Sequence, residues 1–244
     1  MESPATDEPS NSREVSSVVS ANLGRVRERI ARSCERARRN PAEVTLVAVT
    51  KYAQLDCVRA LVALGAVELG ESRPQQLVAR AAELDASIHW HLIGSLQRNK
   101  IRLVLPVTER IHSVDSLRLL DGIDRIAAEL QVRPRVLIEV NLTGEESKHG
   151  FRRDELIAAW DQIIVCRNVQ VDGLMTMAAY ASDPEASRPT FAALRTLRDE
   201  LRRNSPAEMP LNDLSMGMSG DFEVGIEEGA TLVRVGSALW EGLE

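Results

Sequence analysis

Short apolar runs that alternate with amphipathic segments are the feature that most constrains the fold of this chain. Eight of these runs predict β-strands, at residues 44–50, 67–71, 88–93, 110–114, 135–141, 170–175, 212–217 and 231–235. Helical spacing between them predicts helices at residues 54–64, 74–84, 115–130, 152–165 and 187–203. Strands that are joined by helices pair in parallel. The pattern therefore predicts an α/β chain folded as a single closed (β/α)8 TIM barrel.

The length of 244 residues fits one barrel of this type, which typically needs about 250 residues. An open doubly wound sheet is the alternative, but that fold usually carries a glycine-rich phosphate loop after its first strand. Here the first strand is followed by TKYAQ, which has no glycine. We expect residues 1–14 to form a disordered polar tail. Residues 15–244 should form one domain, with an extra N-terminal helix before the barrel.

The composition excludes several classes of protein. An apolar share of 44 % and no apolar run near the roughly 20 residues that span a bilayer argue against a membrane protein. Without a secretory signal, a cytoplasmic location is expected. Three well-separated cysteines argue against a disulfide framework or a cysteine-bound metal. The net charge of −6, and an arginine-rich helix without interleaved aromatic residues, argue against a nucleic-acid partner.

Lys51 ends the first predicted strand, in the sequence VTLVAVTKYAQ. In a parallel barrel the carboxyl ends of the strands meet at one face, where active groups lie. An amine there, partly desolvated by the barrel walls, is a nucleophile toward aldehydes. A lysine that only extends into solvent is the alternative. The chain has only two other lysines, Lys100 and Lys148, and both lie in polar segments.

An aldehyde ligand held by a lysine indicates pyridoxal phosphate, which also requires a phosphate site. Barrels of this type often build that site from the loops after strands seven and eight. The first of these loops contains Gly217, Ser219 and Gly220, and the second contains Gly236 and Ser237. Free backbone N–H groups and hydroxyls in both loops would bind a dianion. Alternatively, the two serines only cap helices.

Arg234 interrupts the apolar strand TLVRVG, where a charge without a partner would be costly. One interpretation pairs it with a barrel carboxylate such as Glu139. The other places its guanidinium against the pyridine nitrogen of the cofactor. A permanent cation at that position discourages protonation of the ring and weakens it as an electron sink.

Seven motifs together resemble the pyridoxal phosphate homeostasis protein family. They are LVAVTK, GES, HWHLIGSLQRNK, VNLTGEESKHG, GLMTM, SMGMSGD and VRVGSALWEG, in this order over about residues 16–244. Members of that family resemble the barrel domain of alanine racemase, of PLP fold type III, without its second domain. The resemblance implies that Lys51 forms an internal aldimine with pyridoxal 5′-phosphate and that Arg234 faces the pyridine nitrogen. It also implies that Ser219, Gly236 and Ser237 bind the phosphate.

The resemblance further implies that His91, Met175 and Met218 form the pocket wall. At one position the chain departs from the family, which commonly has asparagine after the dipeptide GE. Here Ser72 follows that dipeptide. Its shorter side chain can lose a hydrogen bond to the substituents of the cofactor ring.

The function that the resemblance implies is a reversible carrier, which buffers pyridoxal phosphate and passes it to PLP-dependent apoenzymes. A PLP-dependent amino-acid racemase or decarboxylase is the alternative. Racemisation needs an acid/base group on each face of the substrate carbanion. The only tyrosines, Tyr52 and Tyr180, have no evident partner to orient them. We therefore expect a non-catalytic protein, and, without a second domain after Arg234, a monomer.

A metal-dependent barrel hydrolase is a further alternative. In the sequence HWH, His89 and His91 would point to one side of a strand, and His112 lies in another strand. Such sites usually add acidic ligands from other strand ends, and the sequence offers no clear set. We expect these histidines to be packing residues and no metal to be bound.

Overall fold

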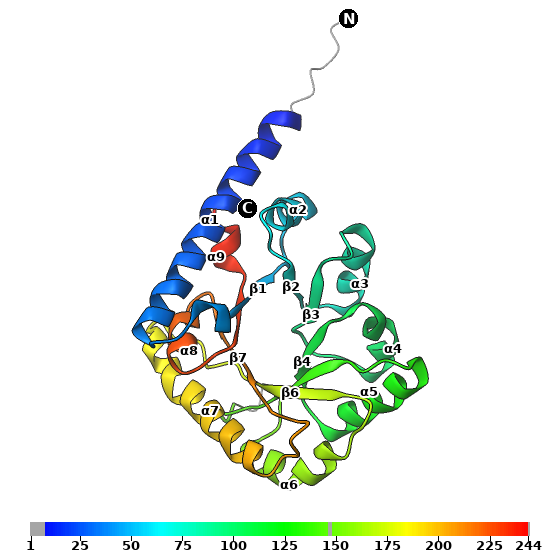
Figure 1. Ribbon diagram of the computed structural model, residues 1–244. Coiled ribbons are helices and arrows are strands. Elements are labelled where there is room, and N and C mark those ends of the chain that lie inside the picture. Colours follow the sequence, from blue (N-terminus) through cyan, green and yellow to red (C-terminus); the bar gives the residue numbers. More distant parts are fainter. Residues whose placement is uncertain (1–7, 146–147, 244) are drawn as a thin grey trace, which may run out of the picture.

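The computed structural model, which describes residues 8–145 and 148–243, is a closed barrel of parallel strands in the order β1 to β8 (Figure 1). The strands are β1 (Thr45–Val49), β2 (Glu68–Glu71), β3 (His89–Leu92), β4 (Arg110–Val114), β5 (Arg135–Glu139), β6 (Gln170–Met175), β7 (Asp213–Met218) and β8 (Leu232–Val235). All eight predicted strands are confirmed, and their ends differ from the predicted ones by no more than two residues. The closed order excludes the open doubly wound sheet.

The helices lie outside the barrel and cover it (Figure 1). They are α1 (Glu8–Arg36), α2 (Leu55–Ala63), α3 (Pro74–Glu83), α4 (Ile101–Val104), α5 (Leu117–Leu130), α6 (Arg153–Ile164), α7 (Arg188–Arg203), α8 (Phe222–Glu227) and α9 (Ser237–Trp240). All five helices with predicted bounds are confirmed. None of the helices in the described residues is long and apolar enough to cross a membrane.

The extra helix α1 begins earlier than expected. Residues 8–14, which we placed in a disordered tail, are helical, and residues 1–7 lie outside the described residues. Polar residues can extend a helix whose other half is anchored, because each added residue gains one backbone hydrogen bond. The anchored half buries an apolar face, Val19, Leu23, Val26, Ile30 and Cys34.

Helix α1 packs against α2, α8 and α9, alongside which it runs in Figure 1. Its arginine-rich face is largely exposed, and two of these arginines also contact carboxylates of α8: Arg29 pairs with Glu223 at 2.6 Å and Arg36 with Glu227 at 2.7 Å. The buried Asn22 donates from Nδ2 to the carbonyl oxygens of Leu239 and Glu241, both at 2.9 Å. These bonds attach α1 to the segment that follows β8.

The main hydrophobic core lies between the barrel and its helices, whereas the barrel interior holds only a small apolar group. That group is Val47, Leu137, Met175 and Leu232. Strand pairing places Val47 opposite Arg234, so both side chains lie on the interior side of the sheet. Much of the remaining interior is polar, and this polar interior forms the site described below.

Replacing Asn22 with alanine should lower the free energy of unfolding by about 1–3 kcal/mol, because the buried carbonyl group of Leu239 and the partly buried one of Glu241 lose their donor. Urea denaturation of the variant and the wild type measures this. Arg32→Ala is the matched control on the same helix, since its pair with Glu28 is exposed and such pairs contribute about 0.5 kcal/mol. Equal effects of the two substitutions would contradict the role given to Asn22.

Candidate functional site

The turn after β1 carries Lys51 at the carboxyl end of the barrel. Thr50 precedes it and is buried, with its N–H donating to Gly70 O at 2.9 Å and its Oγ1 lying 3.3 Å from Glu71 Oε2. Lys51 itself is exposed, and its Nζ lies 5.0 Å from the centre of the Tyr52 ring. We expected the barrel walls to desolvate this amine. The structure differs because the turn carries Lys51 beyond the end of the strand.

Buried polar residues under this turn hold it in place. Glu71, fully buried at the end of β2, lies 3.7 Å from Arg80 Nε. Arg80 donates from Nη2 to Ala53 O at 2.7 Å, and Gln76 donates to Lys51 O at 3.3 Å. Side chains of α3 thus fix the backbone on which the amine is carried. Sequence reasoning missed Glu71 and Arg80, although a charged residue that ends an apolar strand was the same signal that identified Lys51.

The loops after β7 and β8 lie together, as their predicted role requires. Ser219 Oγ accepts hydrogen bonds from the N–H groups of Gly236 at 3.1 Å and Ala238 at 3.5 Å. Trp240 of α9 donates from Nε1 to Val49 O at 2.7 Å, so this pair of loops adjoins the end of β1. Within the described residues, the backbone N–H groups of three loop residues donate to no acceptor: Ser219, Gly220 and Ser237.

Neither serine is the N-cap residue of a helix, as the capping alternative would require. Ser219 Oγ accepts from N–H groups at the start of α9, across the gap between the loops, whereas the N-cap of α8 in its own loop is Asp221. Ser237 is exposed, and the N-cap of α9 is Gly236. Gly217 has φ of +94°, and a Cβ there would lie 2.7 Å from Phe222 Cα, so only glycine fits this turn.

Arg234 lies in the barrel interior and is almost completely buried. It donates from Nη1 to Ser215 Oγ at 2.5 Å and from Nη2 to Thr176 O at 3.0 Å. Thr176 directly follows β6, so the guanidinium lies toward the carboxyl ends of the strands. Burial lowers the pKa of Arg234 to about 10, which leaves it a cation at neutral pH.

Glu139, the expected structural partner of Arg234, does not form an ion pair with it. Among the described residues, Arg234 has hydrogen bonds only to Ser215 and Thr176, and Glu139 acts on it only at longer range. Burial, and secondarily the charge of Asp115, raise the pKa of Glu139 to about 7. The barrel mouth thus holds a cation and a weakly acidic carboxyl group that are not paired with each other.

The three histidines of the metal alternative are explained by contacts with other side chains. His89 and His91 do share one side of β3, where both bind Glu68: His89 Nδ1 lies 2.8 Å from Oε1 and His91 Nε2 lies 2.6 Å from Oε2. His91 Nδ1 lies 2.8 Å from His112 Nε2. In residues 8–145 and 148–243, no group of three or more histidine, cysteine or acidic side chains is arranged to hold a metal.

The predicted pocket-wall residues are not all at the mouth. His91 is buried in the interior with both ring nitrogens engaged, so it does not line the mouth. Met175 is buried at the end of β6 in the small interior apolar group, and Met218 is exposed at the end of β7. Ser72 is partly buried after β2, and its N–H donates to Glu71 Oε1 at 2.7 Å.

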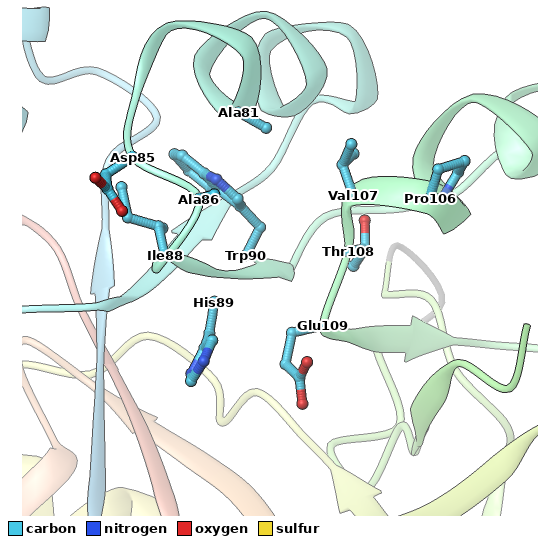
Figure 2. Close-up of a pocket in the computed structure, with 10 residues that line it drawn as sticks. All are labelled: Ala81, Asp85, Ala86, Ile88, His89, Trp90, Pro106, Val107, Thr108 and Glu109. Atoms are coloured by element: carbon cyan, nitrogen blue, oxygen red, sulfur yellow. The ribbon is translucent and has the colours of Figure 1, made fainter.

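Two cavities in the described residues lie away from Lys51 and Arg234. The larger, of about 380 Å³, lies at the amino-terminal ends of β3 and β4, and Figure 2 shows its lining, including His89, Trp90 and Glu109. The smaller, of about 250 Å³, is lined by the loop after β5, including Lys148. Lys148 Nζ lies 2.8 Å from Glu145 Oε1, and Lys100 lies in the 3-10 helix Arg98–Lys100.

Comparison with known proteins places the chain among barrel proteins that are associated with pyridoxal phosphate. The model of the alanine racemase N-terminal domain family matches residues 21–243. The chain is 42 % identical to the pyridoxal phosphate homeostasis protein of Aquifex aeolicus, over 89 % of this chain and 95 % of that protein. It is 35 % identical to the human protein of that name, over 91 % of this chain and 86 % of that protein.

Solved structures agree with these matches. PipY of Synechococcus elongatus PCC7942, with PLP bound, superimposes with a TM-score of 0.77 at 36 % identity, covering 88 % of this chain and 99 % of PipY. Alanine racemase from Bartonella henselae, with covalently bound pyridoxal phosphate, has a TM-score of 0.71 at 14 % identity and covers 92 % of this chain and 58 % of the racemase. The racemase match shows only a shared fold.

The raised pKa of Glu139 predicts that Glu139→Gln stabilises the protein more as pH rises. The folded carboxyl group holds its proton up to about pH 7, whereas the unfolded one loses it near 4.3, so wild-type stability falls between these values. The gain of the variant should grow across this window to at most about 4 kcal/mol. Urea denaturation from pH 4 to 8 measures it, with the exposed Glu83→Gln as control. A gain that does not depend on pH would contradict the prediction.

Proposed function

We propose a function from the premise that this chain belongs to the pyridoxal phosphate homeostasis protein family. The protein binds pyridoxal 5′-phosphate reversibly, keeps its reactive aldehyde out of free solution and releases it to PLP-dependent apoenzymes. One observation carries the proposal: Lys51 follows β1, the end of which is joined to the paired loops after β7 and β8 by the bond from Trp240 to Val49 O, and the buried Arg234 of the neighbouring β8 has no carboxylate partner in the described residues. PipY, a relative of similar length, has been solved with PLP bound.

The residues at the barrel mouth suit the three chemical groups of this ligand. Pyridoxal phosphate, when bound, supplies an aldehyde that joins an amine covalently with loss of water. Lys51 offers that amine in an exposed position, from which water and competing amines can also reach the bond. The free backbone N–H groups of Ser219, Gly220 and Ser237 can bind a phosphate. Arg234 supplies a fixed cation for the pyridine nitrogen.

Support for a carrier, as opposed to an enzyme, comes from the groups that could act as acid or base. Tyr52 and Tyr180 are both exposed, and neither has a hydrogen bond that would orient it in the described residues. In the described residues Glu139, at the carboxyl end of β5, is the carboxyl group of raised pKa near the mouth, and no hydrogen bond to another side chain orients it. A cytoplasmic location agrees with the free state of Cys34, Cys57 and Cys166.

Lys51→Ala should abolish the visible absorbance of protein incubated with pyridoxal phosphate, because no amine remains to form the covalent bond. Borohydride reduction followed by peptide mapping identifies the modified residue in the wild type, where we expect Lys51. Lys100→Ala is the matched control and should keep the absorbance. A coloured Lys51→Ala protein that is labelled at Lys148 or Lys100 would move the attachment site.

The loaded protein should exchange the α-proton of amino acids no faster than free pyridoxal phosphate does, because no oriented acid or base meets the substrate. Proton NMR of L-alanine and other L-amino acids in deuterated water measures this exchange. Rapid exchange that disappears in Lys51→Ala would favour the racemase alternative.

Light scattering after size exclusion tests the expected monomer in the same preparation.

A further inference from the structure

An unbroken chain of hydrogen bonds crosses the barrel interior from its mouth to its opposite end. Arg234 Nη1 donates to Ser215 Oγ at 2.5 Å, and Ser215 Oγ lies 2.9 Å from His112 Nδ1. His112 Nε2 lies 2.8 Å from His91 Nδ1, and His91 Nε2 lies 2.6 Å from Glu68 Oε2. Glu68 is the first residue of β2, so the chain ends at the amino-terminal end of the barrel.

With both imidazoles neutral, the two ends of this hydrogen-bond chain fix the direction of each hydrogen bond in it. A guanidinium can only donate, and an ionised carboxylate can only accept. Ser215 has one proton, so it accepts from Arg234 and donates to His112 Nδ1. His112 then carries its proton on Nε2 and donates to His91 Nδ1, and His91 donates from Nε2 to Glu68. In this arrangement both imidazoles are Nε2–H tautomers.

The charge state of Glu68 agrees with this direction. Burial opposes ionisation of the carboxyl group, but the hydrogen bonds from His91 and His89 lower its pKa to about 2. Glu68 is therefore an acceptor at neutral pH. His89, with its side chain 51 % exposed, binds the second carboxylate oxygen and so connects this end of the chain to solvent.

A cationic His91 is the competing arrangement. Its Nδ1–H would donate to His112 Nε2, and His112 would then direct an Nδ1–H at Ser215 Oγ, which already accepts from Arg234. Burial lowers the pKa of both histidines, and the nearby cations Arg110 and Arg234 act in the same direction on His112. The surroundings thus favour the neutral pair.

We propose that Ser215, His112 and His91 are positioning residues, which connect Arg234 to the carboxylate of Glu68 and hold its guanidinium in one orientation at the barrel mouth. Hydrogen bonds in a chain polarise one another in a low-dielectric interior. A neutral serine hydroxyl that donates toward Glu68 is consequently a better acceptor for a cation than an isolated hydroxyl. Only the consequence for pyridoxal phosphate rests on the proposed function: the pyridine nitrogen would meet a guanidinium of fixed orientation.

The tautomers can be measured in the ligand-free protein by long-range ¹H–¹⁵N correlation spectra of the imidazole rings. Near neutral pH, we expect His112 and His91 each to show one protonated and one unprotonated nitrogen, with the proton on Nε2. A doubly protonated His91, or an Nδ1–H tautomer in either ring, would overturn the proposal.

Glu68→Gln tests whether the carboxylate at one end of the hydrogen-bond chain sets the tautomers of both histidines. An amide can donate as well as accept, so the direction is no longer fixed, and both His91 and His112 should show mixed tautomers. Glu109→Gln is the matched control, because Glu109 also lies at this end of the barrel but binds Arg135 at 3.3 Å instead of the chain. If Glu68→Gln leaves the tautomer of His112 unchanged, or if the control changes that tautomer equally, Glu68 does not set the tautomer of His112 through the hydrogen-bond chain.

Ser215→Ala removes the link to Arg234. In the ligand-free variant we expect the separate Nη signals of Arg234 to merge as the guanidinium gains rotational freedom. Pyridoxal phosphate should bind on the order of tenfold more weakly, with labelling at Lys51 retained. Ser113→Ala is the control, because Ser113 is a buried strand serine that donates to Gly94 O, outside the chain.

The outcomes separate the two proposals. If Ser215→Ala keeps the Arg234 signals and the ligand affinity of the Ser113→Ala control, the positioning role is wrong even though the ligand binds. A wild-type protein that does not bind pyridoxal phosphate contradicts the proposed function alone, since the tautomer and Nη spectra are recorded without ligand.

Discussion

Pairing of β1 with β8 is the interaction on which the rest of the site depends. It closes the barrel through the register of Val47 with Arg234 and Ala48 with Val235. Residues from the two ends of the domain thereby become neighbours. Gly236 lies so close to β1 that a Cβ there would be 3.3 Å from Val49 Cβ. Without this closure the turn that carries Lys51 and the two glycine-containing loops would have no common mouth.

Arg110 and Arg234 are two buried cations of the same barrel that differ in their partners. The difference indicates a structural role for Arg110 and a binding role for Arg234. Arg110 has carboxylates on two sides, Asp213 at 2.7 Å and Asp172 at 3.1 Å. Arg234 has a hydroxyl and a carbonyl oxygen, and no carboxylate within ion-pair distance in the described residues. A buried charge without a counterion is costly. A site that keeps such a charge beside an open mouth is suited to a polar ligand atom.

The spacing of apolar residues and the parallel topology of the barrel explain what could be predicted from the sequence. Alternating apolar runs set the strands, and a parallel barrel brings their carboxyl ends together, so Lys51 and the loops after β7 and β8 had to share one face. The contacts between side chains could not be read in this way. That Ser219 Oγ accepts from the start of α9 across two loops, and that Glu71 and Arg80 support the turn of Lys51, depends on how far each strand is shifted against its neighbours.

The misplacement of His91 has the same origin. The motif HWHL puts both histidines on the interior side of β3, but it does not say at which depth in the barrel each ring lies. Pairing of His91 with Gly70 and Arg110 places it below the mouth, level with the polar interior. A residue expected to touch the ligand is thereby two side chains away from Arg234.

Carrier and catalyst place opposite demands on such a mouth. A catalyst needs its acid and base held against the substrate and water kept away, whereas a reversible carrier needs the covalent bond to stay accessible to water and to a receiving amine. Here the rigid parts, Arg234 and the paired loops, are those that would bind the ring nitrogen and the phosphate. The amine of Lys51 is exposed, whereas Arg234 is buried. A site that holds the ring nitrogen and the phosphate in place but leaves the aldehyde group accessible favours binding and release over catalysis.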